Sequence, residues 1–237
     1  MVDPLQDRSS CGVVIEDPDT RNFLALRIEK GNPVAGADVV EDDPRKKNAI
    51  TLAVAKLEAE ALCQAVRDVC ERIEIAGSIR RKKPFVHDID IVAIPRFELS
   101  NSNTLFADPE RINLLDQKLA ELTSLGRFST IAGGKKIYRL KSTAAAIPVD
   151  LYVAEPKTWA TLLLIRTGSR EHNIYLCSLA RRLGMQLKAD GSGLYREGKI
   201  IASNSEEEIF RALGLDSIPP ENRERASTHR SRQDRPG

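Results

Sequence analysis

Residues 73–94 read IEIAGSIRRKKPFVHDIDIVAI, and this stretch carries the most structural information in the chain. Two apolar segments flank a glycine–serine turn, four consecutive basic residues and the acidic pair Asp88 and Asp90. The pattern predicts a short strand, a turn that opens a helix, and a second strand over residues 86–94. Because side chains alternate along a strand, we expect both carboxylates on one face and the intervening isoleucine on the other.

A third carboxylate, Asp150, lies in another apolar segment, residues 148–153. Like charges within an apolar strand are costly unless a cation compensates them. If the two strands are neighbours, the three acids converge on a site that suits two Mg²⁺ ions about 3.5–4 Å apart, which Mn²⁺ could replace. Taken alone, the pair Asp88 and Asp90 would fit exposed acids at a strand end equally well.

The turn before the acidic pair has the features of a phosphate-binding site. Gly77 lets the backbone approach an anion, and the Ser78 hydroxyl can donate a hydrogen bond to a phosphate oxygen. Arg80 and Arg81 can each grip a phosphate through two parallel hydrogen bonds. A phosphate site shortly before an acidic pair is what nucleotidyl transfer requires, because the metals and the leaving pyrophosphate must be neighbours.

The composition sets further bounds. The chain has 237 residues, of which 36 are basic and 34 acidic, and this length allows one substantial domain or two small ones. No apolar run approaches the ~20 residues of a membrane helix. Residues 1–10 do not resemble a signal peptide, and the four cysteines form no C-x-x-C pair. We therefore expect an intracellular protein, in the cytoplasm, nucleoid or nucleus, with no membrane partner and no zinc site.

The remaining elements follow from the periodicity of apolar residues. Residues 1–44 are expected to form a weakly organised leader with two short strands, and residues 222–237 a disordered basic tail. Between them, we expect helices over residues 45–72, 114–122, 157–166, 173–183 and 205–213, and strands over residues 73–75, 86–94, 137–140 and 149–153.

Motifs in both halves of the chain resemble one family. Gly77-Ser78-Ile79-Arg80-Arg81, followed by His87-Asp88-Ile89-Asp90, is similar to the signature of the DNA polymerase beta nucleotidyltransferase superfamily. Thr167-Gly168-Ser169 and the later segment Ile218-Pro219-Pro220-Glu221 resemble the thumb of family X DNA polymerases. These motifs span roughly residues 45–225 in the family's order, so the resemblance covers most of the chain.

The resemblance implies a role for each matching residue. Metal binding and catalysis would fall to three carboxylates, Asp88, Asp90 and Asp150. Of these, Asp150 would also help to deprotonate the primer hydroxyl. The outgoing phosphates would be held by the turn and its arginine, namely Gly77, Ser78 and Arg81. Arg45 would add a further phosphate contact.

The incoming nucleotide would meet a second group of residues. Gly168 and Asn173 would contact its sugar and base, and His87 would touch the triphosphate or the primer end, or else be merely structural. The family usually has two aromatic residues or a Gly-Trp pair before Thr-Gly-Ser, where this chain has Ile165 and Arg166. Discrimination between ribose and deoxyribose is therefore open.

Three further departures concern the template and the third carboxylate. Cys177 stands about where many relatives place a template-contacting arginine, which leaves fidelity open. Pro148 and Tyr152 flank Asp150 where relatives often carry arginines.

The expected fold is α+β. It consists of a nucleotidyltransferase palm, with a mixed sheet and helices on one face, over residues 45–155 and a small α/β thumb over residues 156–221. No Gly-x-Gly-x-x-Ala helix-hairpin-helix pattern precedes residue 45, so we expect no lyase or finger module.

The leading hypothesis is a monomeric, DNA-directed repair polymerase that adds nucleotides to a primer 3′ hydroxyl by two-metal catalysis. Its partners would be primer–template or gapped DNA and a nucleoside triphosphate, with RNA left open. Two alternatives remain. One is a template-independent or ribonucleotide-adding terminal transferase, and the other is a catalytically silent nucleic-acid-binding module.

Overall fold

The computed structural model describes residues 11–16, 23–29, 32–33, 49–99 and 111–224. The chain divides into two compact units, Met1–Lys47 and Asn48–Gly237. None of the described helices is long and apolar enough to cross a membrane. The two units are described separately below.

The first unit contains three strands, β1 (Cys11–Glu16), β2 (Phe23–Glu29) and β3 (Asn32–Pro33). They form one sheet in the order β1-β2-β3 with antiparallel neighbours. The two short strands predicted in the leader are therefore confirmed. The turn expected between them and the helix start expected near residue 44 lie outside the described residues.

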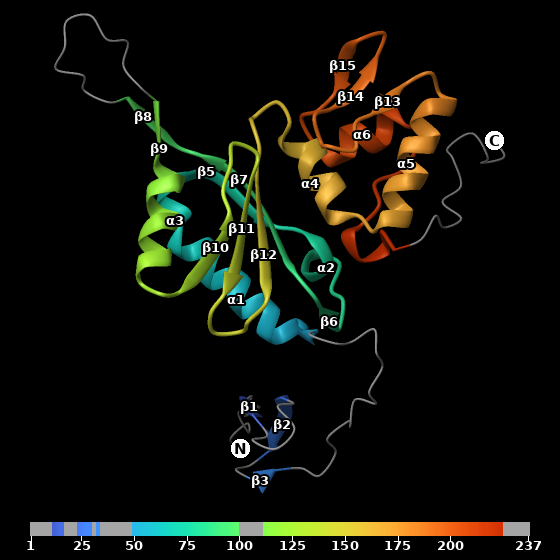
Figure 1. The fold of residues 1–237 in the computed structure, drawn as a ribbon. Helices are drawn as coiled ribbons and strands as arrows, with labels where there is room; N and C mark the ends of the chain where they lie inside the picture. The colour runs from blue at the N-terminus through green and yellow to red at the C-terminus, as the bar shows by residue number, and fades with distance from the viewer. Residues whose placement is uncertain (1–10, 17–22, 30–31, 34–48, 100–110, 225–237) are drawn as a thin grey trace, which may run out of the picture. The chain divides into compact units, whose positions relative to one another are not determined.

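The second unit is built on a five-stranded sheet in the order β10-β11-β12-β7-β5 (Figure 1). These strands are β10 (Phe128–Ala132), β11 (Ile137–Ser142), β12 (Pro148–Val153), β7 (Ile89–Pro95) and β5 (Cys70–Ile75). The central pair β12 and β7 is parallel, whereas every other pair is antiparallel. The predicted mixed sheet of an α+β palm is thus confirmed.

Helices α1 (Leu52–Ala65) and α3 (Leu114–Ser124) cover one face of this sheet (Figure 1). Their apolar side chains share a buried core with Ile89, Ile91 and Ala93 of β7. The next residues along the same strand, Val92 and Ile94, belong to a second core instead. The alternation expected from the sequence therefore holds along β7 and directs Asp90 away from the core that α1 and α3 cover.

Two segments of the palm differ from the prediction. The helix expected over residues 45–72 is shorter, because the Thr51 hydroxyl caps α1 at its start and Cys70 already pairs with β7 at its end. The strand expected over residues 86–94 is divided into β6 (Phe85–Val86) and β7, since β6 pairs with β4 (Ile50–Thr51) and not with the main sheet. Asp88 consequently lies in a bend and not on the strand, which corrects the expected placement.

A smaller α/β body follows and packs on the opposite side of β7 (Figure 1). Its helices are α4 (Trp159–Thr167), α5 (Arg170–Arg182) and α6 (Glu206–Ala212). Its three-stranded sheet consists of β13 (Gln186–Leu187), β14 (Leu194–Arg196) and β15 (Lys199–Ala202). The body ends in a 3₁₀ helix, η3 (Pro220–Asn222). Its buried side chains join Val92 and Ile94 in the second core.

Two small elements complete the second unit. Helix α2 (Gly77–Arg80) follows β5 directly, and the antiparallel pair β8 (Phe97–Leu99) and β9 (Arg111–Asn113) extends from the end of β7 (Figure 1). The predicted disordered tail was expected to begin at residue 222. The described chain instead continues through Arg223, which is buried in the smaller body.

Candidate active site

Two of the three candidate carboxylates meet in the centre of the palm sheet. Asp90 of β7 and Asp150 of β12 are paired residues in the parallel register, so their side chains leave the sheet on the same face. Both are half-buried, whereas Asp88 in the preceding bend is exposed. The Tyr152 hydroxyl donates a hydrogen bond to Asp150 Oδ2 (3.1 Å), and Arg139 Nε approaches Asp150 Oδ1 at 3.9 Å.

The electrostatic state of Asp90 shows that the three acids act on one another. Burial raises the pKa of Asp90 to about 7, and the charges of Asp88 and Asp150 add to this shift. Arg166 and Arg81 oppose it in part. Near neutral pH, the cluster therefore holds negative charge that a cation would stabilise.

The residues fit a divalent metal in their chemistry. Within the described part of the chain, no three His, Cys, Asp or Glu side chains are gathered into a preformed metal cage. The donor set is nevertheless one of carboxylate oxygens, which Mg²⁺ and Mn²⁺ prefer, and Mg²⁺ commonly takes only one or two protein carboxylates beside waters and phosphates.

The turn at Gly77 and Ser78 lies directly against Asp90. Gly77 has a φ of +58°, and a Cβ at this position would collide with Asp90 Oδ2, so glycine is required on two counts. The buried Ser78 hydroxyl has no hydrogen-bond partner among the described residues. It is available to donate to a ligand beside the acids, and its predicted phosphate contact stays a prediction.

The two arginines of this turn are already engaged by the smaller body. Arg80 forms a two-pronged ion pair with Glu206 (2.8 Å for both contacts) and donates to Thr167 Oγ1 (2.7 Å). Arg81 donates to the Thr167 carbonyl (2.7 Å) and to Glu224 (2.6 Å). The sequence gives no sign of these partners, because Glu206 lies in a separate predicted helix and Glu224 falls within the tail expected over residues 222–237.

The side chain of Arg166 extends from α4 towards the acids. Its guanidinium carbon lies 4.0 Å from the centroid of the Tyr152 ring, a cation–π contact. Its charge also acts on Asp90, and its buried Nε has no hydrogen-bond partner among the described residues. Ile165 is buried in the second core, so of the pair expected beside the sugar only Arg166 reaches towards the acids.

Gly168 and Asn173 lie together at the junction of α4 and α5. Asn173 Nδ2 donates to the Ile165 carbonyl (2.8 Å), and a Cβ on Gly168 would collide with Asn173 Oδ1. Asn173 Oδ1 is buried and has no hydrogen-bond partner within the described ranges. The contact of this pair with the sugar and base of a nucleotide stays a prediction.

The other candidates are less informative. His87 is exposed in the same bend as Asp88. Arg45 lies outside the described residues. Cys177 is partly buried, and its sulfur lies 3.6 Å from the Leu187 carbonyl in the smaller body.

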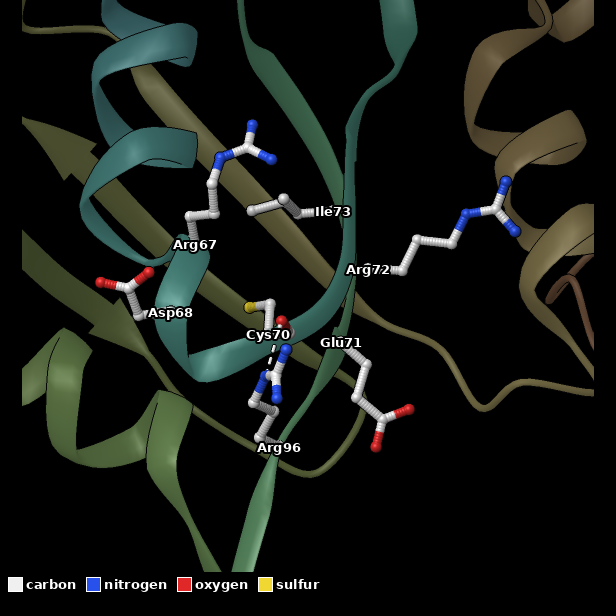
Figure 2. Close-up of a pocket in the computed structure, with 7 residues that line it drawn as sticks. All are labelled: Arg67, Asp68, Cys70, Glu71, Arg72, Ile73 and Arg96. Atoms are coloured by element: carbon white, nitrogen blue, oxygen red, sulfur yellow. Dashed lines mark hydrogen bonds between the residues drawn. The ribbon is translucent and has the colours of Figure 1, made fainter.

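A cavity of about 530 Å³ lies away from this cluster, at the beginning of β5. Figure 2 shows its lining, in which Arg67 and Arg72 point in different directions and Arg96 donates to the Cys70 carbonyl (3.0 Å). Its charged groups do not converge on a common point, so it does not compete with the acidic cluster as a candidate active site.

Comparison with known proteins agrees with this architecture. Residues 162–224 match the family described as DNA polymerase beta thumb. The solved structure of Leishmania infantum polymerase beta in a ternary P/T complex aligns with a TM-score of 0.61 and 24% identity, over 76% of this chain and 78% of the other. The ternary gap complex of that polymerase gives a TM-score of 0.59 and 23% identity, over 74% and 70%.

The chain has the family X DNA polymerase fold. A curated member of family X, the DNA polymerase/3′-5′ exonuclease PolX of Bacillus subtilis, is 29% identical over 150 residues. The match covers 63% of this chain but spans only 24% of the relative's length. The α4–η3 body is the part of the chain that matches the polymerase beta thumb family, and the resemblance stated from the sequence is confirmed.

Proposed function

We propose that this family X chain is a metal-dependent nucleotidyltransferase that adds nucleotides to the 3′ hydroxyl of a DNA primer. The observation that carries the proposal is the pairing of Asp90 with Asp150 in adjacent parallel strands, beside the Gly77–Ser78 turn. Acids and turn together supply the groups that bind a metal–triphosphate complex.

The reaction would form a bond between the primer 3′ oxygen and the α-phosphorus, while the bond to the leaving pyrophosphate breaks. Asp150 would accept the proton of the 3′ hydroxyl, since the Tyr152 hydroxyl orients its carboxylate through a single hydrogen bond (3.1 Å). Asp88, Asp90 and Asp150 would hold two Mg²⁺ ions. When bound, these ions lower the pKa of the hydroxyl and neutralise charge on the phosphates.

The other residues would position the nucleotide. The Ser78 hydroxyl and Arg81 would bind the outgoing phosphates, with Gly77 allowing their approach to the backbone. Gly168 and the Asn173 amide would contact the sugar and base. Fixing the reactants in this way contributes to rate because it replaces a bimolecular encounter with an oriented one.

The expected partner is DNA with a recessed or gapped end. The two Leishmania polymerase structures are ternary complexes, one of them with a gap, which supports primer–template and gapped DNA as substrates. We further propose a palm over residues 45–155, a thumb over residues 156–221 and a role in DNA repair inside the cell, carried out by a monomer.

A second candidate is a terminal transferase that ignores the template or accepts ribonucleotides. The position of Arg166 favours it, because its guanidinium stacks on Tyr152. The family usually has two aromatic residues or a Gly-Trp pair where this chain has Ile165 and Arg166. A cationic group could interact with a ribose hydroxyl through hydrogen bonds that an aromatic ring does not form.

The test is primer extension on single-stranded, recessed and one-nucleotide-gapped DNA, with dNTPs or rNTPs and with Mg²⁺ or Mn²⁺. Asp150→Ala should lower the rate at least ~100-fold, since it removes both a metal ligand and the proposed base. The matched control is Asp68→Asn, an exposed acid near the beginning of β5. Templated extension supports the proposal, untemplated addition supports the second candidate, and no extension on any substrate contradicts both.

A further inference from the structure

The carboxylate of Glu224 occupies a position between two cations of the palm. Its oxygens lie 2.6 Å from Arg81 Nε and 3.0 Å from Lys83 Nζ. Burial raises the pKa of Glu224, but the hydrogen bonds from Arg81 and Lys83 outweigh this and hold it below its ordinary value. Arg81 and Lys83 therefore form a site that already accommodates one oxyanion.

The backbone fixes Glu224 in this position. The Ser169 hydroxyl donates to the Glu224 carbonyl (2.8 Å), and the Ser169 amide donates to the Arg223 carbonyl (3.0 Å). The side chain of Arg223, only 2% exposed, forms an ion pair with Glu206 at 2.7 Å. An ordered thumb segment thus delivers the carboxylate to the palm.

The same position adjoins the acidic cluster. The charge of Arg81 acts on Asp90, so its guanidinium is within electrostatic reach of both Asp90 and Glu224. The Lys83 amide donates to the Ser78 carbonyl (3.0 Å), which ties Lys83 to the turn that carries the buried, unpartnered Ser78 hydroxyl. Arg81 and Lys83 therefore belong to the same short segment as the Gly77–Ser78 turn, and the charge of Arg81 reaches the acids.

A polyphosphate is better suited to these groups than a carboxylate. It has more charge and more acceptor oxygens, and a guanidinium binds phosphate in a two-pronged geometry. The Lys83 side chain is 40% exposed and that of Glu224 is 31% exposed, so an anion from solvent can reach the site.

We propose that Arg81 and Lys83 form the oxyanion site for the polyphosphate of the nucleotide, and that Glu224 is an internal competitor that occupies it beforehand. The inference rests on the proposed function for the identity of the ligand, and it adds Lys83 and Glu224 to the residues that set nucleotide affinity. Any polyphosphate must first displace the Glu224 carboxylate, and this competition lowers the apparent affinity of the chain for polyphosphate.

The test measures binding of inorganic tripolyphosphate to the full chain by calorimetry, without DNA and without metal. Glu224→Gln removes the competing charge and should tighten binding about 3- to 10-fold, the range expected for a partly exposed charge pair. Lys83→Gln should weaken binding by a similar factor, both alone and in the Glu224→Gln background. Melting temperatures recorded alongside establish that each variant folds.

The matched control is Glu221→Gln. Glu221 comes from the same segment and pairs with Lys82 at 3.2 Å, but that pair is exposed and lies outside the Arg81–Lys83 site. It should leave tripolyphosphate binding unchanged. Unchanged or weaker binding by the folded Glu224→Gln protein would overturn the inference, because Glu224 would then merely orient Arg81. Absence of tripolyphosphate binding to both wild type and Glu224→Gln would overturn it as well.

This experiment is separable from the test of the proposed function. Tripolyphosphate binding needs neither a primer nor the three aspartates. A protein that fails to extend primers but shows tighter binding in Glu224→Gln retains the oxyanion site and its competitor. If the protein extends primers but Glu224→Gln does not bind tripolyphosphate more tightly, the proposed function stands and the inference about Glu224 is wrong.

Discussion

Asp90 and Asp150 lie directly opposite one another on the parallel strands β7 and β12. Neighbouring strands in this register bring two carboxylates to one face, where burial and mutual repulsion raise the pKa of Asp90 to about 7. The arrangement is unfavourable in the metal-free protein and becomes favourable when a cation is bound. The first two predictions follow from this relationship.

Asp90→Asn should stabilise the metal-free protein at alkaline pH. The folded state holds the Asp90 proton more tightly than the unfolded chain does, so stability is lost as pH rises from the ordinary value of 3.8 to about 7. Asparagine removes this loss, and at pH 8 we expect the melting temperature to rise by about 3–8 °C, given about 2–4 °C per kcal/mol. The difference should shrink at pH 5.5. Thermal denaturation in EDTA measures it, and an equal effect at both pH values would contradict the explanation.

Metal affinity should rise with pH up to about 7 and then level off. Below that pH, a divalent ion must displace the proton of Asp90, so each unit of pH should increase the apparent affinity up to ~10-fold. Titration with Mn²⁺, followed by the electron paramagnetic resonance signal of the free ion, measures this. Asp90→Asn should bind Mn²⁺ weakly without the pH dependence, and a steep dependence retained in that variant would assign the proton to another group.

Glu206→Ala should destabilise the chain strongly. Glu206 joins Arg80 of the palm to Arg223 of the thumb, with oxygens 2.7–3.3 Å from both guanidinium groups. Removing the carboxylate leaves two arginines uncompensated, one of them fully buried, so the free energy of unfolding should fall by about 3–5 kcal/mol. Urea denaturation measures the change. The exposed Glu207 on the same helix provides a control, because Glu207→Ala should change stability by less than about 0.5 kcal/mol.

Gly77→Ala should abolish primer extension. It should also lower the free energy of unfolding by more than the backbone strain of a positive φ accounts for. A positive φ costs a residue with a Cβ about 1–2 kcal/mol, and here the Cβ would also collide with Asp90 Oδ2 and displace a carboxylate of the site. Gly126→Ala is the matched control. Gly126 has a φ of +72°, but a Cβ there meets nothing within 4 Å. If Gly126→Ala and Gly77→Ala reduced extension equally, backbone strain and not the contact with Asp90 would be responsible.

Much of the palm could be predicted from local patterns. Alternation along residues 89–94 indicated which side chains enter the core, and the structure agrees because a strand has a fixed period of two. The glycine–serine turn and the apolar segment around Asp150 likewise pointed to one site before any pairing was known. The misplacement of Asp88 arose because β6 pairs with β4, a partner that no local pattern reveals.

Local sequence patterns were enough to predict β5, β7, β11 and β12, the acids and turn of the candidate site, and the family resemblance, but they gave no sign of the edge strand β10. Only the tertiary structure decided that Arg80 and Arg81 are bound by Glu206 and Glu224, residues 126 and 143 positions away. It also decided that Arg166 stacks on Tyr152 beside the acids. Periodicity in the sequence indicates only which face of a helix or strand is buried. The ion pairs between palm and thumb depend instead on how the two hydrophobic cores pack on opposite faces of β7.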